Sequence, residues 1–357
     1  MTWVRKIPIL LLAAALALAG CATRPPASPD TYARSPPQAG DVLRSTAIDR
    51  TVEDRILALD PEHISEADVR DTLSAGPAPR IVLLHGGVPG VYLLMVSFGR
   101  FLVGMGYPEA QIRDPRDRDW SRTPYEDSAH VAGLVAWHYE RDGVRPMLVG
   151  HSQGGVQAVK VLRALNGAFG DRIAVWDPMA DAALDRTSIL DPLTGRMQPV
   201  VGFALPYASV VGAGGISLAN PRHWDMIGHL YTIPNTVEDF TGYSIEFDPI
   251  AWTLPGSDAD PYRHNGKATV RNVMLPSSYS HVFVPLTHEL ASDARTRDWI
   301  NAYTPPAGAG LNPPPDLGQN ALWAADVWYS IKKHWCLEAQ QLIRARRATL
   351  GQPGRTG

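Results

Sequence analysis

Short apolar runs alternate with amphipathic segments through the middle of this 357-residue chain. Apolar runs of strand length stand at 80–84 (RIVLL), 146–150 (PMLVG), 229–235 (HLYTIPN) and 268–275 (ATVRNVML). Helical patterns lie near 93–105, 128–140 and 156–166. Apolar strands separated by helices are typical of a parallel sheet covered on both faces. The pattern therefore predicts an α/β fold, with a doubly wound and mostly parallel sheet flanked by helices.

An irregular region, 171–230, interrupts this alternation. Thr187 to Pro206 holds two strand-like runs around DPLTG (191–195), a good turn sequence, and this predicts a β-hairpin in or beside the sheet. The apolar, glycine-rich stretch 201–219 is compatible with a lid or with a core segment. We therefore expect an insertion at about 178–228 that holds the hairpin and a lid-like segment near the functional site.

Helical patterns flank this middle on both sides. Residues 51–75 look helical, with Ser65 to Asp68 as a capping box. A proline- and glycine-rich link, 305–315, leads to a last helix, 322–347, whose Trp323, Trp328 and Trp335 predict a face packed on the domain. We expect one domain at 49–304, followed by the link and C-terminal helix at 305–357.

The N-terminus has the build of an export signal. Arg5 and Lys6 precede an apolar run that is short for a bilayer span. Leu18-Ala19-Gly20-Cys21 resembles the lipobox of bacterial lipoproteins, in which the cysteine becomes the lipidated first residue. The resemblance implies a signal peptide at 1–20 and lipidation of Cys21. An ordinary cleaved signal and a short anchor are the alternatives.

The residues after Cys21 extend this prediction. Residues 22–38 are rich in proline, serine and alanine, which predicts a flexible tether at 21–48. Ala22, rather than an aspartate, follows the cysteine. By resemblance to Gram-negative lipoproteins, this implies an anchor on the periplasmic face of the outer membrane in a host with two membranes.

Composition and charge argue against several classes of function. With 45% hydrophobic and 19% charged residues, the chain can bury a sizeable core. The net charge of −3 is scattered along the chain, so we expect no nucleic-acid partner. No Cys or His cluster has metal-ligand spacing, and the glycine-rich loops lack a phosphate-binding lysine, so we expect no metal and no cofactor. With Cys21 lipidated, Cys336 has no partner for a disulfide.

Ser152 stands where an apolar strand gives way to a helix. Gly150-His151-Ser152-Gln153-Gly154 matches G-x-S-x-G and is followed by another glycine. A serine on this turn sits in a strained backbone with its hydroxyl exposed, and the glycines let the chain turn without a Cβ clash. The following helix points free N–H groups and its positive dipole end at the place where an oxyanion would form. We predict that Ser152 is a nucleophile.

A second glycine-rich turn, His85-Gly86-Gly87, follows the strand at 81–84. Such a turn lets backbone N–H groups approach a substrate oxygen closely. With these two turns the chain resembles the serine esterase and lipase branch of the α/β-hydrolase superfamily, over about 79–303. The resemblance implies an oxyanion hole from the N–H groups of Gln153 and Gly87, with Val88 as the alternative to Gly87. It implies a loop-organising role for His85.

The resemblance also implies the chain order serine, acid, histidine. We expect His281 to be the base, because it follows a strand and a short loop and precedes a helix; His288 is its main rival. The acid should lie in the loop after the preceding strand, where we choose Asp239. Glu238, Asp248 and Asp177 remain as alternatives.

This set of residues predicts hydrolysis of carboxylic esters through a covalent acyl-enzyme. The apolar stretch 201–219 and the lipid anchor favour a hydrophobic substrate, a small-molecule or lipid ester. An acyltransferase, a thioesterase or a peptidase would use the same triad. The alternative from another class is an inert hydrolase fold that acts as a binding module of the cell envelope. The oligomeric state stays open.

Overall fold

The structure is a computed structural model that describes residues 37–38, 40–251, 261–305, 317 and 319–351. The predicted signal peptide at 1–20, Cys21, most of the tether and most of the proline-rich link lie outside the described residues.

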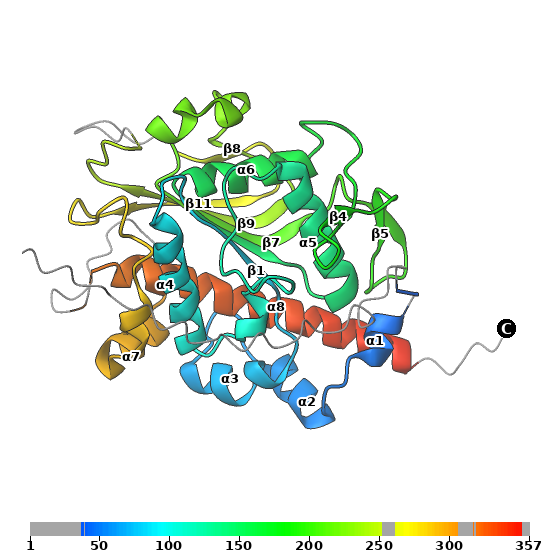
Figure 1. Ribbon diagram of the computed structural model, residues 1–357. Coiled ribbons are helices and arrows are strands. Elements are labelled where there is room, and N and C mark those ends of the chain that lie inside the picture. Colours follow the sequence, from blue (N-terminus) through cyan, green and yellow to red (C-terminus); the bar gives the residue numbers. More distant parts are fainter. Residues whose placement is uncertain (1–36, 39, 252–260, 306–316, 318, 352–357) are drawn as a thin grey trace, which may run out of the picture. The chain divides into compact units, whose positions relative to one another are not determined.

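Five parallel strands form the central sheet (Figure 1). In spatial order they are β1 (Ile81–Leu84), β2 (Met147–His151), β7 (Leu205–Val211), β9 (Val237–Ile245) and β11 (Thr269–Leu275). Every neighbouring pair runs parallel. All residues of β1, β2 and β7 are buried, as expected for strands covered on both faces. The predicted α/β class with a parallel sheet is confirmed.

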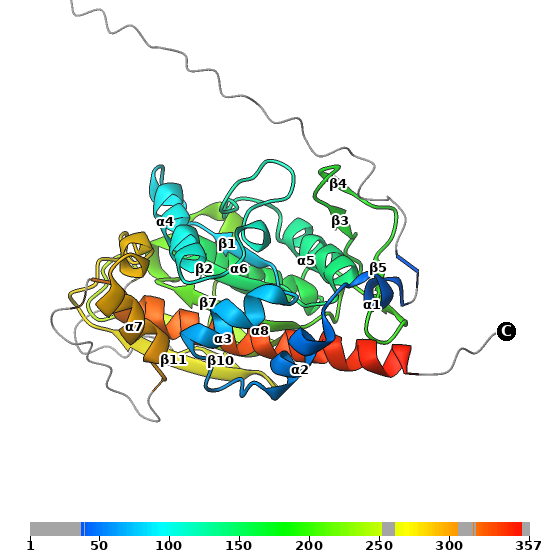
Figure 2. The same cartoon turned by 90° about the horizontal axis from the view of Figure 1, so that it is seen from below.

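Helices cover both faces of this sheet (Figures 1 and 2). The helices of the described chain are α1 (Asp41–Ser45), α2 (Arg50–Ala58), α3 (Glu66–Asp71), α4 (Val91–Gly104), α5 (Ser128–Asp142), α6 (Gln153–Leu165), α7 (Ala294–Ala302) and α8 (Ala321–Leu350), of which α4, α6 and α8 contact the central strands directly. In Figure 1, α6 lies above the sheet with α5 packed beside it at the right, and α8 lies below the sheet. Alternate strand residues, among them Leu83 and Val149, share one core cluster with Phe98 of α4 and Trp323 of α8. Because successive side chains of a strand point to opposite faces of the sheet, one set packs against α4 and α8 and the other set faces the opposite helical layer.

The N-terminal helical segment has the expected extent but is broken into three pieces. Instead of one helix over 51–75 there are α2, α3 and a 3₁₀ helix, Leu73–Ala75. The capping box is confirmed, since Ser65 Oγ accepts from the Asp68 N–H and the Asp68 carboxylate accepts from the Ser65 N–H. The tether does not extend to 48, because Leu43 of α1 is buried against Leu342 of α8.

The irregular region contains the predicted hairpin. Antiparallel strands β5 (Ser188–Leu190) and β6 (Met197–Pro199) flank the DPLTG turn and form a separate two-stranded sheet. Gly195 has a φ of 70°, which glycine adopts without steric cost. The stretch 201–219 is divided, because its first half is the central strand β7 and its second half ends in the 3₁₀ helix Gly215–Ala219. A second 3₁₀ helix, Pro221–Met226, follows it.

One predicted strand is misplaced. In HLYTIPN only β8 (Thr232–Ile233) is a strand, and it pairs with β10 (Arg263–His264) outside the central sheet. The fourth central strand is β9, which begins two residues after HLYTIPN ends. Its first residues include the exposed Glu238 and the half-buried Asp239, so they have the polarity of a loop. A small antiparallel pair, β3 (Trp176–Asp177) and β4 (Ala182–Ala183), also lies outside the central sheet.

The C-terminal helix belongs to the core of the described fold. Trp323, Trp328 and Trp335 are each at most 1% exposed, so the predicted packing is confirmed. The Trp335 indole N–H donates to Pro77 O at 2.9 Å, and its ring lies edge-on to Tyr107 with 4.7 Å between centroids. No helix in the described ranges is both long and apolar enough to cross a bilayer.

We expect Trp335→Ala to lower the free energy of unfolding by about 3–5 kcal/mol, because it removes a fully buried indole and leaves a cavity. Leu350→Ala, at a 52% exposed position of the same helix, should change it by no more than about 0.5 kcal/mol. Urea unfolding of the two variants measures both. Equal losses would contradict the assignment of α8 to the core.

Candidate active site

Ser152 sits on a strained turn between β2 and α6. Its φ and ψ are 54° and −122°, a region that residues with a Cβ rarely adopt. Its backbone N–H donates to Val211 O, at the end of β7, at 2.8 Å. The flanking strand and helix maintain this strained conformation. The Ser152 side chain therefore lies at the carboxyl end of the sheet.

Two glycines make this turn sterically feasible. A Cβ on Gly150 would lie 2.5 Å from Gly154 O, and a Cβ on Gly154 would lie 2.1 Å from Leu84 O. Both distances are too short for any side chain, because the partner atoms belong to the backbone. The glycines therefore let α6 begin directly against the ends of β1 and β2.

The structure brings Ser152, His281 and Asp248 into one hydrogen-bonded chain. Ser152 Oγ lies 2.9 Å from His281 Nε2, and His281 Nδ1 lies 2.6 Å from Asp248 Oδ2. The His281 side chain is 7% exposed and the Asp248 side chain is fully buried. With Nδ1–H donating to the carboxylate, Nε2 is free to accept the proton of the serine hydroxyl. This arrangement can activate a serine for attack on a carbonyl carbon.

The choice of Asp239 as the partner of His281 was wrong. Asp239 lies near the start of β9, beside Tyr207 and Thr269 of the neighbouring strands. Its carboxylate accepts from His334 Nε2 at 3.1 Å and lies 3.5 Å from Lys333 Nζ. The expectation of an acid in the loop after the preceding strand holds, but that strand is β9. Its following loop carries Asp248.

The other acidic alternatives also have partners elsewhere. Glu238 forms an ion pair with Arg145 at 2.6 Å. Asp177 lies at the end of β3, where Oδ1 accepts from the backbone N–H of Met179 at 2.9 Å. Neither carboxylate is hydrogen-bonded to His281.

The Asp248 carboxylate is held in its charged form. Burial by itself raises the pKa of Asp248, but the His281 ring and the backbone N–H groups of Ala251 and Ile250 donate to it and keep the pKa below its usual value. These two N–H groups donate to Oδ1 at 3.1 and 2.9 Å. Oδ2 is therefore left to orient the imidazole.

The rival histidine, His288, is engaged away from the serine. It lies in the 3₁₀ helix His288–Ala291, with Nδ1 3.1 Å from Ser97 Oγ of α4 and Nε2 2.6 Å from Glu289. Ser97 also accepts from the backbone N–H of Thr287 at 3.0 Å. This cluster fixes the chain after His281 to α4.

Two residues that sequence reasoning missed position His281. His151 is 1% exposed, and burial, followed by the proximity of His281, lowers its pKa to about 3. Its neutral ring places Nε2–H 2.7 Å from the His281 carbonyl oxygen. On the other side Gly212 has a φ of 64°, and a Cβ there would lie 2.8 Å from His281 Cε1. His151 stood within the serine motif, whereas nothing in the sequence singled out Gly212.

A third missed residue, Ser217, lies beside the nucleophile position. Its hydroxyl oxygen is 3.4 Å from Ser152 Oγ, and the residue is 2% exposed. It comes from the 3₁₀ helix Gly215–Ala219, within the stretch that was compatible with a lid. The second half of that stretch thus forms a wall of the site.

The H-G-G turn also reaches the serine. A Cβ on Gly86 would lie 3.3 Å from Ser152 Cβ, and a Cβ on Gly87 would overlap the Gln153 side chain. Gln153 is the first residue of α6, where backbone N–H groups have no partner within the helix. The two segments predicted to form an oxyanion hole are therefore neighbours.

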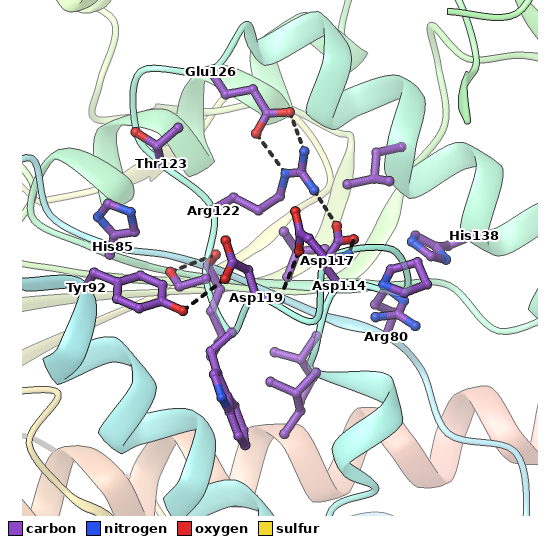
Figure 3. A pocket seen from close by; sticks show the side chains of 18 residues that line it. Arg80, His85, Tyr92, Asp114, Asp117, Asp119, Arg122, Thr123, Glu126 and His138 are labelled. Atoms are coloured by element: carbon purple, nitrogen blue, oxygen red, sulfur yellow. Dashed lines mark hydrogen bonds and ion pairs between the residues drawn. The ribbon is translucent and has the colours of Figure 1, made fainter. Parts of the chain in front are cut away.

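His85 is hydrogen-bonded within this turn and not to the serine in the described structure. Its Nδ1 is 2.7 Å from Gly86 O, its ring packs edge-on to Tyr92, and burial lowers its pKa. It borders a cavity of about 260 Å³ between β1 and the segment 112–126 (Figure 3). Across that cavity Arg122 pairs with both Glu126 and Asp114. These contacts agree with a loop-organising residue.

Within the described ranges, no group of three or more His, Cys, Asp or Glu side chains could hold a metal ion.

Comparisons with known proteins add little to this geometry. No protein-family model matches the chain, and no curated protein does. Among solved structures, "RedJ with PEG molecule bound in the active site" aligns at 15% identity and a TM-score of 0.27, covering 63% of this chain and 90% of that one. At this TM-score the likeness carries no argument, so the α/β fold rests on the strands and helices described above.

We expect the His281 Nδ1 proton to give a resonance far downfield in proton NMR, because a short hydrogen bond to a carboxylate deshields it. Asp248→Ala should abolish this resonance, and Asp239→Ala should retain it. The opposite result would return the acid to Asp239.

Proposed function

We propose that this chain is a serine hydrolase with the α/β-hydrolase fold, which cleaves carboxylic esters through an acyl-enzyme. One observation carries the proposal: a strained serine is hydrogen-bonded to a histidine whose other nitrogen faces a buried carboxylate. Strain of this kind is stored where function needs it. A turn with only a structural role would not require the His281 imidazole to be hydrogen-bonded to the Ser152 hydroxyl.

The proposed reaction begins when His281 Nε2 removes the proton of Ser152 as the serine attacks the ester carbonyl. Asp248 holds the imidazole in the required tautomer and stabilises the imidazolium. N–H groups of Gln153 and of the H-G-G turn, at Gly87 or Val88, stabilise the tetrahedral oxyanion. His281 then protonates the leaving alcohol and activates the water that releases the acyl group.

Exposed apolar side chains support a hydrophobic ester as the substrate. Val88, Ile216, Phe247 and Phe283 are between 47% and 65% exposed. Each lies within two residues of a site residue along the chain, and apolar groups in such places favour an acyl chain or an apolar alcohol. The substrate class we propose is therefore a hydrophobic small-molecule or lipid ester.

The proposed location rests on the sequence alone. Leu18 to Cys21 supports lipidation of Cys21, which would place the enzyme at a membrane of the cell envelope. Palmitate labelling of the expressed chain and of its Cys21→Ser variant tests this separately from activity.

We expect the protein lacking residues 1–21 to hydrolyse p-nitrophenyl esters. Ser152→Ala, His281→Ala and Asp248→Ala should each lower kcat/KM by about 10³-fold or more, as loss of a triad member does. Asp239→Ala is the matched control and should stay within about threefold of the parent. Initial rates from acetate to palmitate also give the preferred chain length.

Two results would overturn this proposal. A parent that hydrolyses no ester and does not react with a fluorophosphonate would favour an inert binding module. Reaction with the fluorophosphonate, but acyl transfer to an alcohol or thiol instead of water, would favour an acyltransferase.

The close contact between Gly212 and the His281 ring predicts a loss of activity when Gly212 is replaced. We expect Gly212→Ala to lower kcat by about 10²-fold, because the added Cβ displaces the His281 ring and small misplacements of this size are costly in catalysis. Gly202→Ala is the control, since Gly202 also has a positive φ but no atom lies within 4 Å of the added Cβ. Equal activities for the two variants would show that the space beside His281 is not required.

A further inference from the structure

Tyr125 joins the two segments that flank the oxyanion position. Its hydroxyl lies 2.7 Å from Gly87 O and 2.7 Å from Gln153 Oε1. Gly87 belongs to the H-G-G turn after β1, and Gln153 is the first residue of α6. The hydroxyl has one proton, which it donates to one of these two oxygens at a time or shares between them, and in either case it links the two segments.

The H-G-G turn needs such a restraint. Two successive glycines have the widest conformational freedom of any residues, and an oxyanion hole works only when its N–H groups are already oriented. A Cβ on Gly87 would lie 2.3 Å from the Tyr125 hydroxyl and 1.6 Å from Gln153 Oε1. A side chain at this position would therefore displace the Tyr125 hydroxyl and the Gln153 side chain, so in the arrangement observed the restraint on the turn comes from outside it.

A bond to the Gly87 carbonyl supplies that restraint. The peptide unit is planar and trans, so fixing the direction of Gly87 O also fixes the N–H of Val88 in the opposite direction. The contact with the Gln153 side chain restrains the residue whose backbone N–H begins α6. One hydroxyl thus restrains both the Gly87–Val88 peptide group and the side chain of Gln153, the residue that follows the serine.

Tyr125 is itself held by a rigid segment. The Arg122 N–H donates to Leu83 O at 2.8 Å and its carbonyl accepts from the His85 N–H at 3.2 Å, so the segment is tied to β1 and its following turn. The Arg122 guanidinium makes two 2.7 Å bonds to Glu126 (Figure 3). Gln157 of α6 donates to Glu126 O at 2.8 Å. The residues on both sides of Tyr125 are therefore anchored to the same two elements that it bridges.

We propose that Tyr125 is a positioning residue that orients the oxyanion hole by holding the Gly87 carbonyl and the Gln153 side chain through its hydroxyl. This inference rests on the proposed hydrolase function. It assigns to Tyr125 no contact with substrate and no proton transfer, and it accounts for a half-buried tyrosine turned toward a glycine turn.

The test is Tyr125→Phe in the protein lacking residues 1–21. We expect kcat to fall by about 10-fold or more while KM stays within about twofold, because a loosened oxyanion hole weakens binding of the transition state and not of the ester. The Ki of a trifluoromethyl ketone, which forms the tetrahedral oxyanion on the serine, should rise by the same factor. Tyr92→Phe is the matched control, since it removes a hydroxyl from the same region that lies 3.3 Å from Asp119.

The results separate this inference from the proposed function. An inactive parent that is also unreactive to a fluorophosphonate overturns the proposed function and the inference with it. An active parent whose Tyr125→Phe variant keeps the parental kcat and Ki overturns the inference alone. A loss of kcat without a matching rise in Ki assigns Tyr125 a merely structural role and also overturns it.

A second variant decides the matter if Tyr125→Phe does not fold. Gln153→Leu keeps the backbone N–H and the bulk of the side chain but removes the acceptor for the Tyr125 hydroxyl. We expect a fall in kcat of about threefold or more with a parallel rise in Ki; parental values for both would overturn the inference.

Discussion

The strained backbone of Ser152 is the constraint on which the rest of the site depends. A positive φ at a residue with a Cβ persists only when neighbouring elements hold it. Here the Val211 carbonyl accepts the serine N–H, and Gly150 and Gly154 let α6 start against β1 and β2. The hydroxyl is thereby presented at the carboxyl edge of the sheet in a fixed place, around which every other group can be arranged.

The parallel sheet then gathers the remaining groups. The H-G-G turn follows β1, Ser152 follows β2, Gly212 follows β7, Asp248 follows β9 and His281 follows β11. Because all five strands point the same way, these five connections emerge at one edge, where open α/β sheets place their ligands. His85 of the first connection and His281 of the last are 196 positions apart in the chain (281 − 85), yet the common direction of the strands brings both to the same edge of the sheet.

Charged groups near the amino ends of the strands form ion pairs with α8 instead of contributing to the site. Asp239 near the start of β9 pairs with His334 and Lys333 of α8, and Asp326 of α8 is fully buried against Arg271 of β11. A buried carboxylate needs such partners, since an unpaired one would be strongly destabilising. These ion pairs hold α8 against the sheet. The carboxylates of Asp239 and Asp326 therefore stabilise the fold.

The sequence by itself determined the features that depend on residues close together in the chain. The strands at 81–84, 147–151 and 269–275, the elbow at Ser152, the glycine turn at 85–87 and the setting of His281 after a strand are local patterns, and each is where it was expected. The strand expected over HLYTIPN is not, because that segment lies outside the central sheet. Only the tertiary structure decided which carboxylate faces His281. The polar first residues of β9 resemble a loop, so the sequence pattern pointed to Asp239, whereas the observed partner is Asp248 in the loop after β9. The tertiary structure also placed Gly212, Ser217 and Tyr125 beside the site. Their positions are set by the packing of segments far apart in the chain, so no pattern in the neighbouring sequence indicates them.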